Sequence, residues 1–321
     1  MVTLRQLRYF ETLSRTCHFG MAASQCAVTQ PALSMQIKEL EQELGIGLVE
    51  RRGNSVALTL AGQEIAARAG AILTQVRELT DFACQQRGVL TGPLRLGIIP
   101  SVAPYLLPSL LHGVATNYPA LDLLVRETQT DTLVEELARG DLDTALLALP
   151  VSHGQFESMA LFDDRFLIAV QAQAAAGWSP DNLHTRMMRE RLLLLEEGHC
   201  LRDQALQFCQ IANVQARKAL GAASLTTIMQ MVAAGHGITL LPELCAAAEV
   251  DRQRIALIQF PEEPPMRTIG LAWRRTSSRK ADFAALGTLI RELRRTEQGG
   301  ENQPAPDALT DANPIPRVKE T

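Results

Sequence analysis

The spacing of apolar residues at the start of the chain predicts two short helices. Leu4, Leu7, Phe10 and Leu13 share one helical face, which predicts a first helix ending near His18. A second short helix is expected to begin near residue 19, where small residues allow close helix packing. The chain therefore opens with an all-α unit.

The third predicted helix has clear start and stop signals. Thr29 can cap its N-terminus, Pro31 lies in its first turn and Gly45 ends it. Three short helices with a tight turn before the third are typical of a helix-turn-helix, whose second motif helix enters the DNA major groove. Its outward positions would then face DNA, namely Thr29, Gln30, Pro31, Ser34, Met35 and Lys38. A plain three-helix bundle with a polar surface fits the same pattern.

Residues 48–58 have the pattern of a hairpin wing. Arg51 and Arg52 precede a Gly53-Asn54 turn between two short apolar runs. These arginines would contact the DNA backbone, although exposed arginines are often only solvated charges. We therefore predict a winged helix-turn-helix domain over residues 1–58.

A long helix is predicted after Thr59 and reaches about residue 87. Apolar positions alternate by four and three along it, which indicates a heptad seam. We predict that this helix, within a linker of residues 59–88, forms a dimer through Ile65, Ile72, Val76 and Leu79. The competing prediction is that the helix packs on the C-terminal domain of its own chain.

Beyond residue 89, strands and helices alternate, which predicts an α/β domain. The expected strands are 94–99, 121–127, 143–149, 166–170, 192–195, 238–241, 255–259 and 268–273. Near-continuous apolar runs favour mostly parallel sheets, and ligands then bind at strand carboxyl ends. Ser101 and Thr130 follow the first two strands, where each is by default a helix cap but also points a hydroxyl into the crevice. We predict a two-lobed domain over residues 89–298 and a disordered tail over 299–321.

Composition narrows the class of protein. The 321 residues are 46% hydrophobic, enough for two or three domains, and the net charge of -4 does not itself indicate nucleic-acid binding. We see no leader and no apolar run long enough for a membrane span, so we expect a soluble cytoplasmic protein. The six cysteines and six histidines lack the spacing of metal ligands. We predict no metal and no cofactor, and Cys17, Cys26, Cys84 and Cys245 as packing residues.

Cys200 and Cys209 form the candidate chemical site. Residues 201–209 have good helix formers, and nine helical steps separate the two Cα atoms by about 13.5 Å. A disulfide needs about 4.4–6.8 Å. If the two cysteines bond, the helix between them must come apart. Both cysteines are otherwise read as small buried hydrophobic residues.

Local chemistry favours a reactive Cys200. It would begin a helix, next to His199 and two residues before Arg202, and these features stabilise a thiolate. Cys209, beside Phe208, would be the quieter partner that resolves a sulfenic acid. These roles are hypotheses.

A longer motif then indicates a family. Residues 19–45, FGMAASQCAVTQPALSMQIKELEQELG, together with LTLAG at 58–62, resemble the N-terminal domain of LysR-type transcriptional regulators. Residues 97–108, 198–209, 231–242 and 267–271 are similar to the peroxide-sensing members of that family. The similarity covers residues 1–295.

The resemblance implies a fold and a set of roles. The fold is a winged helix-turn-helix, a linker helix and a two-lobed effector domain like periplasmic binding proteins, assembled as a homodimer or homotetramer. It implies that Cys200 reacts with peroxide and bonds to Cys209, with a pocket made by Ser101, Thr130, His199 and Arg267. Two departures are notable. Met35 stands where many relatives have Arg, and residues 219–221 lack the His and Arg expected near the pocket.

The function we predict is a transcriptional regulator, not an enzyme, that senses hydrogen peroxide through a reversible Cys200–Cys209 disulfide and controls oxidative-stress genes. Its expected partners are promoter half-sites in double-stranded DNA, RNA polymerase and a cellular thiol reductant, with no membrane. The alternative is a LysR-type regulator that binds a small metabolite in the cleft near Ser101 and Thr130, with incidental cysteines. A thiol enzyme using Cys200 and His199 leaves the helix-turn-helix unexplained.

Overall fold

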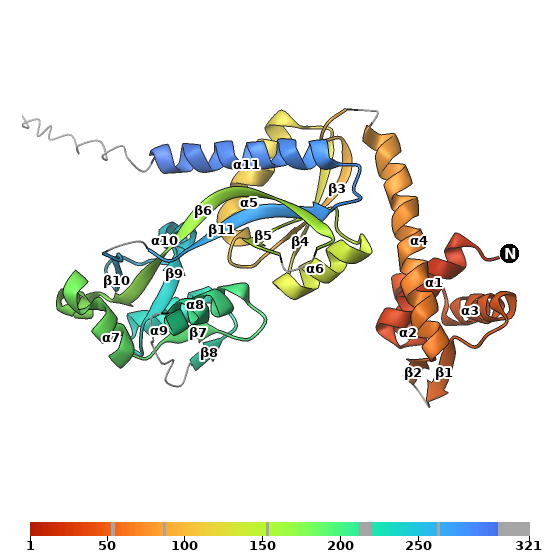
Figure 1. Ribbon diagram of the computed structural model, residues 1–321, viewed down its shortest axis with the longest axis horizontal. Coiled ribbons are helices and arrows are strands. Elements are labelled where there is room, and N and C mark those ends of the chain that lie inside the picture. Colours follow the sequence, from red (N-terminus) through yellow and green to blue (C-terminus); the bar gives the residue numbers. More distant parts are fainter. Residues whose placement is uncertain (53–54, 86–87, 152–153, 212–219, 262–263, 301–321) are drawn as a thin grey trace, which may run out of the picture.

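The structure is a computed structural model that describes residues 1–52, 55–85, 88–151, 154–211, 220–261 and 264–300. Figure 1 shows a small helical unit at one end, a long helix beside it, and a larger α/β part that extends away from both. The tail was predicted from residue 299, but residues 299–300 belong to the last helix; residues 301–321 and the Gly53-Asn54 turn lie outside the described residues.

The N-terminal unit has the predicted winged helix-turn-helix. Its elements are α1 (Leu4–Thr16), α2 (Phe19–Gln25), α3 (Gln30–Leu44), β1 (Val49–Arg52) and β2 (Ser55–Leu58). The Oγ1 atom of Thr29 accepts from the backbone N–H of Ala32 at 3.4 Å, and Gly45 ends α3 in the left-handed conformation at φ 70°. The wing strands pair antiparallel. The sequence signals for α3 are therefore confirmed.

One packing prediction in this unit is wrong. Cys17 is exposed and ends α1 with a φ of 47°, so it does not pack in the core. Cys245, by contrast, is fully buried, as predicted. The apolar core of the unit contains Leu7, Phe10, Leu13, Leu33, Ile37 and Leu40.

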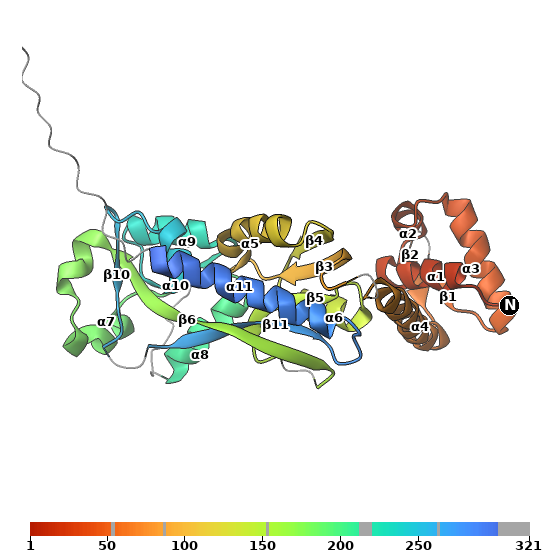
Figure 2. The ribbon, with the colours of Figure 1, turned by 90° about the horizontal axis from the view of Figure 1, so that it is seen from above.

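The linker helix is α4 (Leu60–Gln85). Its first half packs on the helical unit, where Ile65 and Leu73 are half-buried against the core. Its opposite side faces the α/β part in Figure 2. The competing prediction of contacts with the C-terminal domain of the same chain is therefore confirmed, whereas dimer formation through this helix stays a prediction.

The α/β part is built on one mixed sheet with the order β10-β6-β11-β5-β3-β4, and β9 pairs with β6. Its strands are β3 (Gly92–Ile98), β4 (Leu121–Glu127), β5 (Thr144–Leu149), β6 (Phe156–Gln171), β9 (Thr239–Pro242), β10 (Ile255–Ile258) and β11 (Met266–Arg274). A separate parallel pair joins β7 (Leu193–Leu195) to β8 (Leu220–Ala222). Its helices are α5 (Ala103–Asn117), α6 (Thr130–Arg139), α7 (Leu183–Arg189), α8 (Cys200–Ile211), α9 (Leu225–Ala233), α10 (Glu243–Glu249) and α11 (Lys280–Gly300), with 3-10 turns at Ala172–Gly177 and Pro180–Asn182.

The expectation of mostly parallel sheets is wrong. Only β3 pairs parallel with its neighbours in the mixed sheet, whereas β11 runs antiparallel to β5 and β6, and β6 runs antiparallel to β9 and β10. The reason is visible in β6, whose first ten residues mix buried, half-buried and exposed positions. This half-buried pattern belongs to an antiparallel strand and lacks the apolar run on which the prediction relied.

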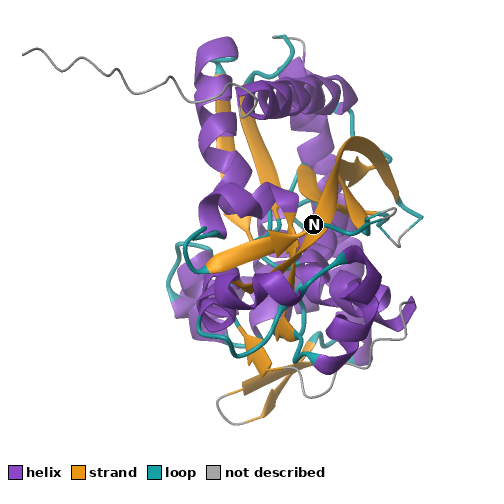
Figure 3. Cartoon of the chain, turned by 90° about the vertical axis from the view of Figure 1, so that its left-hand side faces the viewer, coloured by secondary structure: helices purple, strands orange, loops and turns teal. Residues whose placement is uncertain are grey.

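Two apolar cores define two lobes, and β6 connects them (Figures 1 and 2). The first core lies around β3, β5, β11, α5 and α11, and the second lies around β7, β9, α8 and α9. Tyr105 packs against both cores. Figure 3 shows helices packed around the strands. The predicted two-lobed architecture is thus present.

Candidate functional site

The predicted site residues meet at a small cavity between the lobes. Its volume is about 10 Å³, close to the minimum that one water molecule needs. The cavity is lined by Ile99, Pro100, Ser101, Gln129, Thr130, Gly198, His199, Cys200 and Leu201. Four of the predicted residues therefore line one small space, although they come from three separate segments of the chain.

Cys200 lies at the boundary of the two lobes. It is the first residue of α8, as predicted, and it is half-buried with a free thiol. Its side chain packs against the core of the first lobe, while Leu201 and Ala205 of the same helix belong to the core of the second. A change at this thiol therefore acts on both lobes.

The hydroxyl of Thr130 is a buried polar group without a partner. Thr130 is the first residue of α6, and Gln129 occupies the capping position without a side-chain cap bond. Among the described residues, Thr130 Oγ1 has no hydrogen-bond partner although it is fully buried. The default prediction that Thr130 caps a helix is therefore wrong. A buried hydroxyl without a partner costs free energy, so it is informative that this one lines the cavity.

Ser101 is not a helix cap either. Val102 occupies the capping position of α5, and the Ser101 Oγ atom accepts a hydrogen bond from Nη1 of Arg267 at 2.8 Å. Arg267 does not line the cavity itself, so it belongs to the site through Ser101. The guanidinium in turn forms a buried ion pair with Asp164 at 2.9 Å.

Gly198 lines the cavity and has a backbone conformation that favours glycine. Its φ is +91°, a conformation that side chains rarely adopt, and an added Cβ would lie 2.4 Å from Oε1 of Gln129. The glycine is visible in the sequence, but only the fold reveals its neighbour. Gly198 and Gln129 are thus site residues that sequence reasoning missed.

Arg202 has a structural contact. Its Nη1 donates to the carbonyl oxygen of Leu195 at 2.9 Å and so ties the start of α8 to β7. The stabilisation of a Cys200 thiolate by Arg202 stays a prediction.

The backbone of α8 runs unbroken from Cys200 to Ile211 and includes Cys209. Nine helical steps separate the two cysteines by about 13.5 Å along the axis, roughly twice the span of a disulfide. The side chain of Cys209 lies outside those that the structure describes. In this conformation the two positions are therefore too far apart to bond.

The predicted DNA-contacting residues lie at the start of α3. Thr29, Gln30, Pro31, Met35 and Lys38 are exposed, whereas Ser34 is half-buried. The backbone of Arg51 and Arg52 forms the wing strand β1, and their side chains lie outside the described ones. Base and phosphate contacts by these residues stay predictions.

The predicted dimer face of α4 is partly open. Ile72 and Leu79 are 42% and 69% exposed, and they are spaced one heptad apart. Phe82 extends the same open apolar surface and is also exposed. Val76 is half-buried, and Ile65 packs on the helical unit of its own chain. The exposed part of the seam therefore begins at Ile72.

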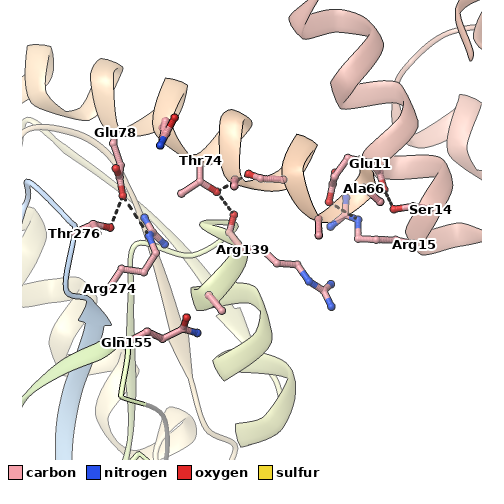
Figure 4. A pocket seen from close by; sticks show the side chains of 15 residues that line it. Glu11, Ser14, Arg15, Ala66, Thr74, Glu78, Arg139, Gln155, Arg274 and Thr276 are labelled. Atoms are coloured by element: carbon pink, nitrogen blue, oxygen red, sulfur yellow. Dashed lines mark hydrogen bonds and ion pairs between the residues drawn. The ribbon is translucent and has the colours of Figure 1, made fainter. Parts of the chain in front are cut away.

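A second, larger cavity lies where the linker helix meets the α/β part. Its volume is about 670 Å³. Figure 4 shows Thr74 of α4 directed at Arg139 of α6, and Glu78 of α4 directed at Thr276 and Arg274. Thr74 Oγ1 donates to the Arg139 carbonyl at 2.6 Å, and Thr276 Oγ1 donates to Glu78 at 2.7 Å.

Charged groups complete this contact. Asp141, which follows α6, forms ion pairs with Arg15 of α1 and Arg77 of α4, each at 3.2 Å. Glu11 of α1 also lines the cavity, and burial raises the pKa of its carboxyl. Polar contacts therefore join both the helical unit and the linker helix to the end of α6.

Two features of the described residues bear on other classes of protein. No group of three or more His, Cys, Asp or Glu side chains in that part of the chain is arranged to hold a metal ion. None of the described helices combines the length and the apolar character that a bilayer span requires.

The chain matches two family models that together cover nearly all of its described length. Residues 4–63 match the bacterial regulatory helix-turn-helix protein of the lysR family, and residues 87–295 match the LysR substrate binding domain. The protein belongs to the LysR family of bacterial transcriptional regulators.

Similar members of that family are named as hydrogen peroxide-inducible activators or as OxyR. The chain is 40% identical over 296 residues to the probable hydrogen peroxide-inducible genes activator of Streptomyces viridosporus, covering 91% of this chain and 95% of the relative. A full-length OxyR variant from Pseudomonas aeruginosa, carrying a cysteine-to-aspartate substitution, is 33% identical with a TM-score of 0.70, over 91% of this chain and 98% of that one. An H2O2-bound OxyR mutant from Corynebacterium glutamicum, carrying a cysteine-to-serine substitution, is 33% identical with a TM-score of 0.63, over 96% and 98%.

Proposed function

We propose that this protein is a transcriptional regulator that detects hydrogen peroxide at Cys200. The observation that carries the proposal is the cavity of about 10 Å³, which places that thiol beside the buried, partnerless hydroxyl of Thr130 and beside Ser101. Its relatives are named for their response to hydrogen peroxide. Peroxide is small, and it both donates and accepts hydrogen bonds, as this polar site requires.

The size of the cavity weighs against a metabolite. Sites for small-molecule ligands usually enclose about 300–1,000 Å³, far more than the space near Ser101 and Thr130. A regulator of this family with a metabolite in the same cleft would need the lobes to separate. Hydrogen peroxide, with only two oxygen atoms, needs a much smaller widening of this space.

The chemistry proceeds in two balanced steps. The Cys200 thiolate attacks one peroxide oxygen, the O–O bond breaks, and a sulfenic acid and hydroxide form. The Cys209 thiol then attacks the sulfenic sulfur, an S–S bond forms, and water leaves. Two electrons pass from the two thiols to peroxide. A cellular dithiol then reduces the Cys200–Cys209 disulfide to two free thiols by thiol–disulfide exchange and is itself oxidised to a disulfide.

The disulfide cannot form on the helix as it stands. Because α8 holds the two cysteines about 13.5 Å apart, at least part of this helix must unwind when they bond. Leu201 and Ala205 then leave their positions in the core of the second lobe. Oxidation must therefore overcome the free energy that burial of these side chains contributes, and reduction restores their burial.

A route from the site to the DNA-binding unit runs along α6. Thr130 at its first turn lines the cavity, and the carbonyl of Arg139 at its last turn contacts Thr74 and Arg77 of the linker helix. Ten residues of helix span about 15 Å. We propose that movement at Cys200 shifts this helix and thereby the spacing of two DNA-binding heads on their half-sites.

In this proposal residues 1–58 bind DNA, residues 59–88 join two copies through Ile72 and Leu79, and residues 89–298 sense peroxide. A regulator with thiol chemistry of this kind works in a reducing cytoplasm. RNA polymerase and a thiol reductant are its proposed partners.

The experiment is peroxide titration of the reduced full-length chain, followed by mass-spectrometric mapping of disulfides and by footprinting on promoter DNA. We expect a Cys200–Cys209 bond and an altered footprint. The Cys200→Ser variant is expected to show neither. Cys245→Ser is the matched control, because Cys245 is buried and burial raises the pKa of its thiol to about 12. A wild-type Cys200 that stays reduced would reject the function.

A further inference from the structure

A buried ion pair supports the cavity from behind. Asp164 of β6 and Arg267 of β11 are direct cross-strand partners, and their side chains are 2% and 1% exposed. Nε of Arg267 donates to the carboxylate oxygen Oδ2 at 3.0 Å, and Nη2 forms an ion pair with the same oxygen at 2.9 Å. A buried pair of this kind adds little net stability compared with apolar residues. Its contacts with the site therefore suggest a functional role.

The rest of the guanidinium is directed at Ser101. Nη1 donates to Ser101 Oγ at 2.8 Å, and Nη2 donates to the Ser101 carbonyl at 3.2 Å. A guanidinium only donates hydrogen bonds, so the Ser101 oxygen acts as the acceptor in this contact. The hydroxyl proton of Ser101 must then point away from Arg267. Since Ser101 lines the cavity, its O–H is available as a donor to a molecule inside.

The second oxygen of Asp164 is also fixed. Its Oδ1 accepts from the backbone N–H of Leu244 in α10 at 2.9 Å. The carboxylate is thus held by β11 on one side and by α10 on the other. Its orientation, and with it the orientation of Arg267, is set by the fold.

We propose that Asp164 is a positioning residue for the reaction with peroxide, because it holds Arg267 so that Ser101 presents a hydrogen-bond donor to the cavity. This inference rests on the proposed function. When the O–O bond breaks, negative charge develops on the departing oxygen. A donor with a fixed direction stabilises that charge more than a freely rotating hydroxyl does. Asp164 itself does not line the cavity, so it acts only through Arg267 and Ser101.

The test compares two reactions of the same thiol in the full-length protein. Peroxide needs the donor, whereas iodoacetamide alkylates Cys200 without it. Asp164→Asn offers one acceptor oxygen where two are needed, and its NH2 faces a donor. We expect about a tenfold slower oxidation by peroxide, with alkylation within about twofold of wild type. Asp163→Asn is the matched control, because Asp163 is the exposed neighbour and accepts from Thr268.

Ser101→Ala makes the test specific for positioning. We expect this variant to lose about the same peroxide rate, and the double variant D164N/S101A to be no slower than S101A alone. Losses that multiply, or an equal loss of alkylation, would overturn the positioning role. If D164N does not fold, the neutral pair D164N/R267Q leaves no buried unpaired charge and is expected to react at the S101A rate. A wild-type rate in that pair would also overturn the inference.

The outcomes separate this inference from the proposed function. If peroxide oxidises wild-type Cys200 and the D164N protein equally fast, only the positioning role of Asp164 fails. If wild-type Cys200 does not react with peroxide, the proposed function itself fails.

Discussion

The substitution Thr130→Val should change the stability of the protein and its rate of reaction with peroxide in opposite directions. Valine keeps the β-branched shape of threonine and replaces the buried, partnerless hydroxyl with a methyl group. An unsatisfied buried hydroxyl costs about 1–3 kcal/mol. Because the cavity is near the lower limit for one water molecule, hydration relieves part of that cost. We therefore expect the reduced protein to gain about 1 kcal/mol, at the lower end of this range.

Peroxide sensing should change in the opposite direction. If the Thr130 hydroxyl binds peroxide, its removal costs the reaction one hydrogen bond in a buried site. One such bond contributes about 0.5–1.5 kcal/mol, so Cys200 should oxidise up to about tenfold more slowly. A more stable protein that senses less well is the expected phenotype.

Two assays on the reduced full-length chain test this trade-off. Calorimetry should show the transition of the regulatory part shifted upward by about 2–4 °C. Rapid-mixing kinetics with quenching by alkylation give the rate of Cys200 oxidation. Thr132→Val is the control, since Thr132 lies in the same helix, is half-buried and does not line the cavity. Wild-type oxidation kinetics in T130V, or a loss of stability above about 1 kcal/mol, would refute the reasoning.

Three further substitutions test other parts of the structure. Gly198→Ala should lower the thermal midpoint and slow peroxide oxidation, because the new Cβ would lie 2.4 Å from the Gln129 side chain and because alanine in this left-handed backbone conformation costs about 1–2 kcal/mol. Gly221→Ala is the control and should change neither quantity in the same two assays. Arg77→Met removes an ion pair and a carbonyl contact between the linker helix and the α/β part; unfolding should change by less than about 1 kcal/mol, while promoter footprints of the oxidised and reduced forms become more alike. Burial raises the pKa of the Glu11 carboxyl above its usual 4.5, so the folded state holds this proton more strongly than the unfolded state. The contribution of this carboxyl to the stability of the folded state therefore falls as the pH rises from 4.5 through the raised pKa. Glu11→Gln should therefore raise the thermal midpoint more at neutral pH than near pH 4.5, and an equal change at both would contradict that account.

Local signals in the sequence predicted the local structure well. The cap at Thr29 and the glycine at 45 fixed the ends of α3, and the four-three spacing found the linker helix. The first half of β6 was missed because it has no continuous apolar run, and that antiparallel strand joins the lobes. Periodicity identifies an element, but it does not identify the neighbour that a strand pairs with.

In the candidate site, too, the local features were predictable from the sequence and the contacts between distant segments were not. Cys200 was recognisable from its neighbours in sequence and begins α8 as predicted. The sequence could not show that Ser101 and Thr130 do not cap helices, because this depends on the residues at which α5 and α6 begin. Asp164 gave no signal at all, since its role arises from the register between β6 and β11, two strands about a hundred residues apart in the chain.

Oxidation of Cys200 should unwind α8, and amide hydrogen exchange over Cys200–Ile211 measures this directly. We predict protected amides in the reduced protein, loss of that protection after peroxide treatment, and its return with a dithiol reductant. In Cys209→Ser, peroxide should leave the protection of the helix unchanged. A disulfide between residues 200 and 209 that forms while these amides stay protected would contradict the account.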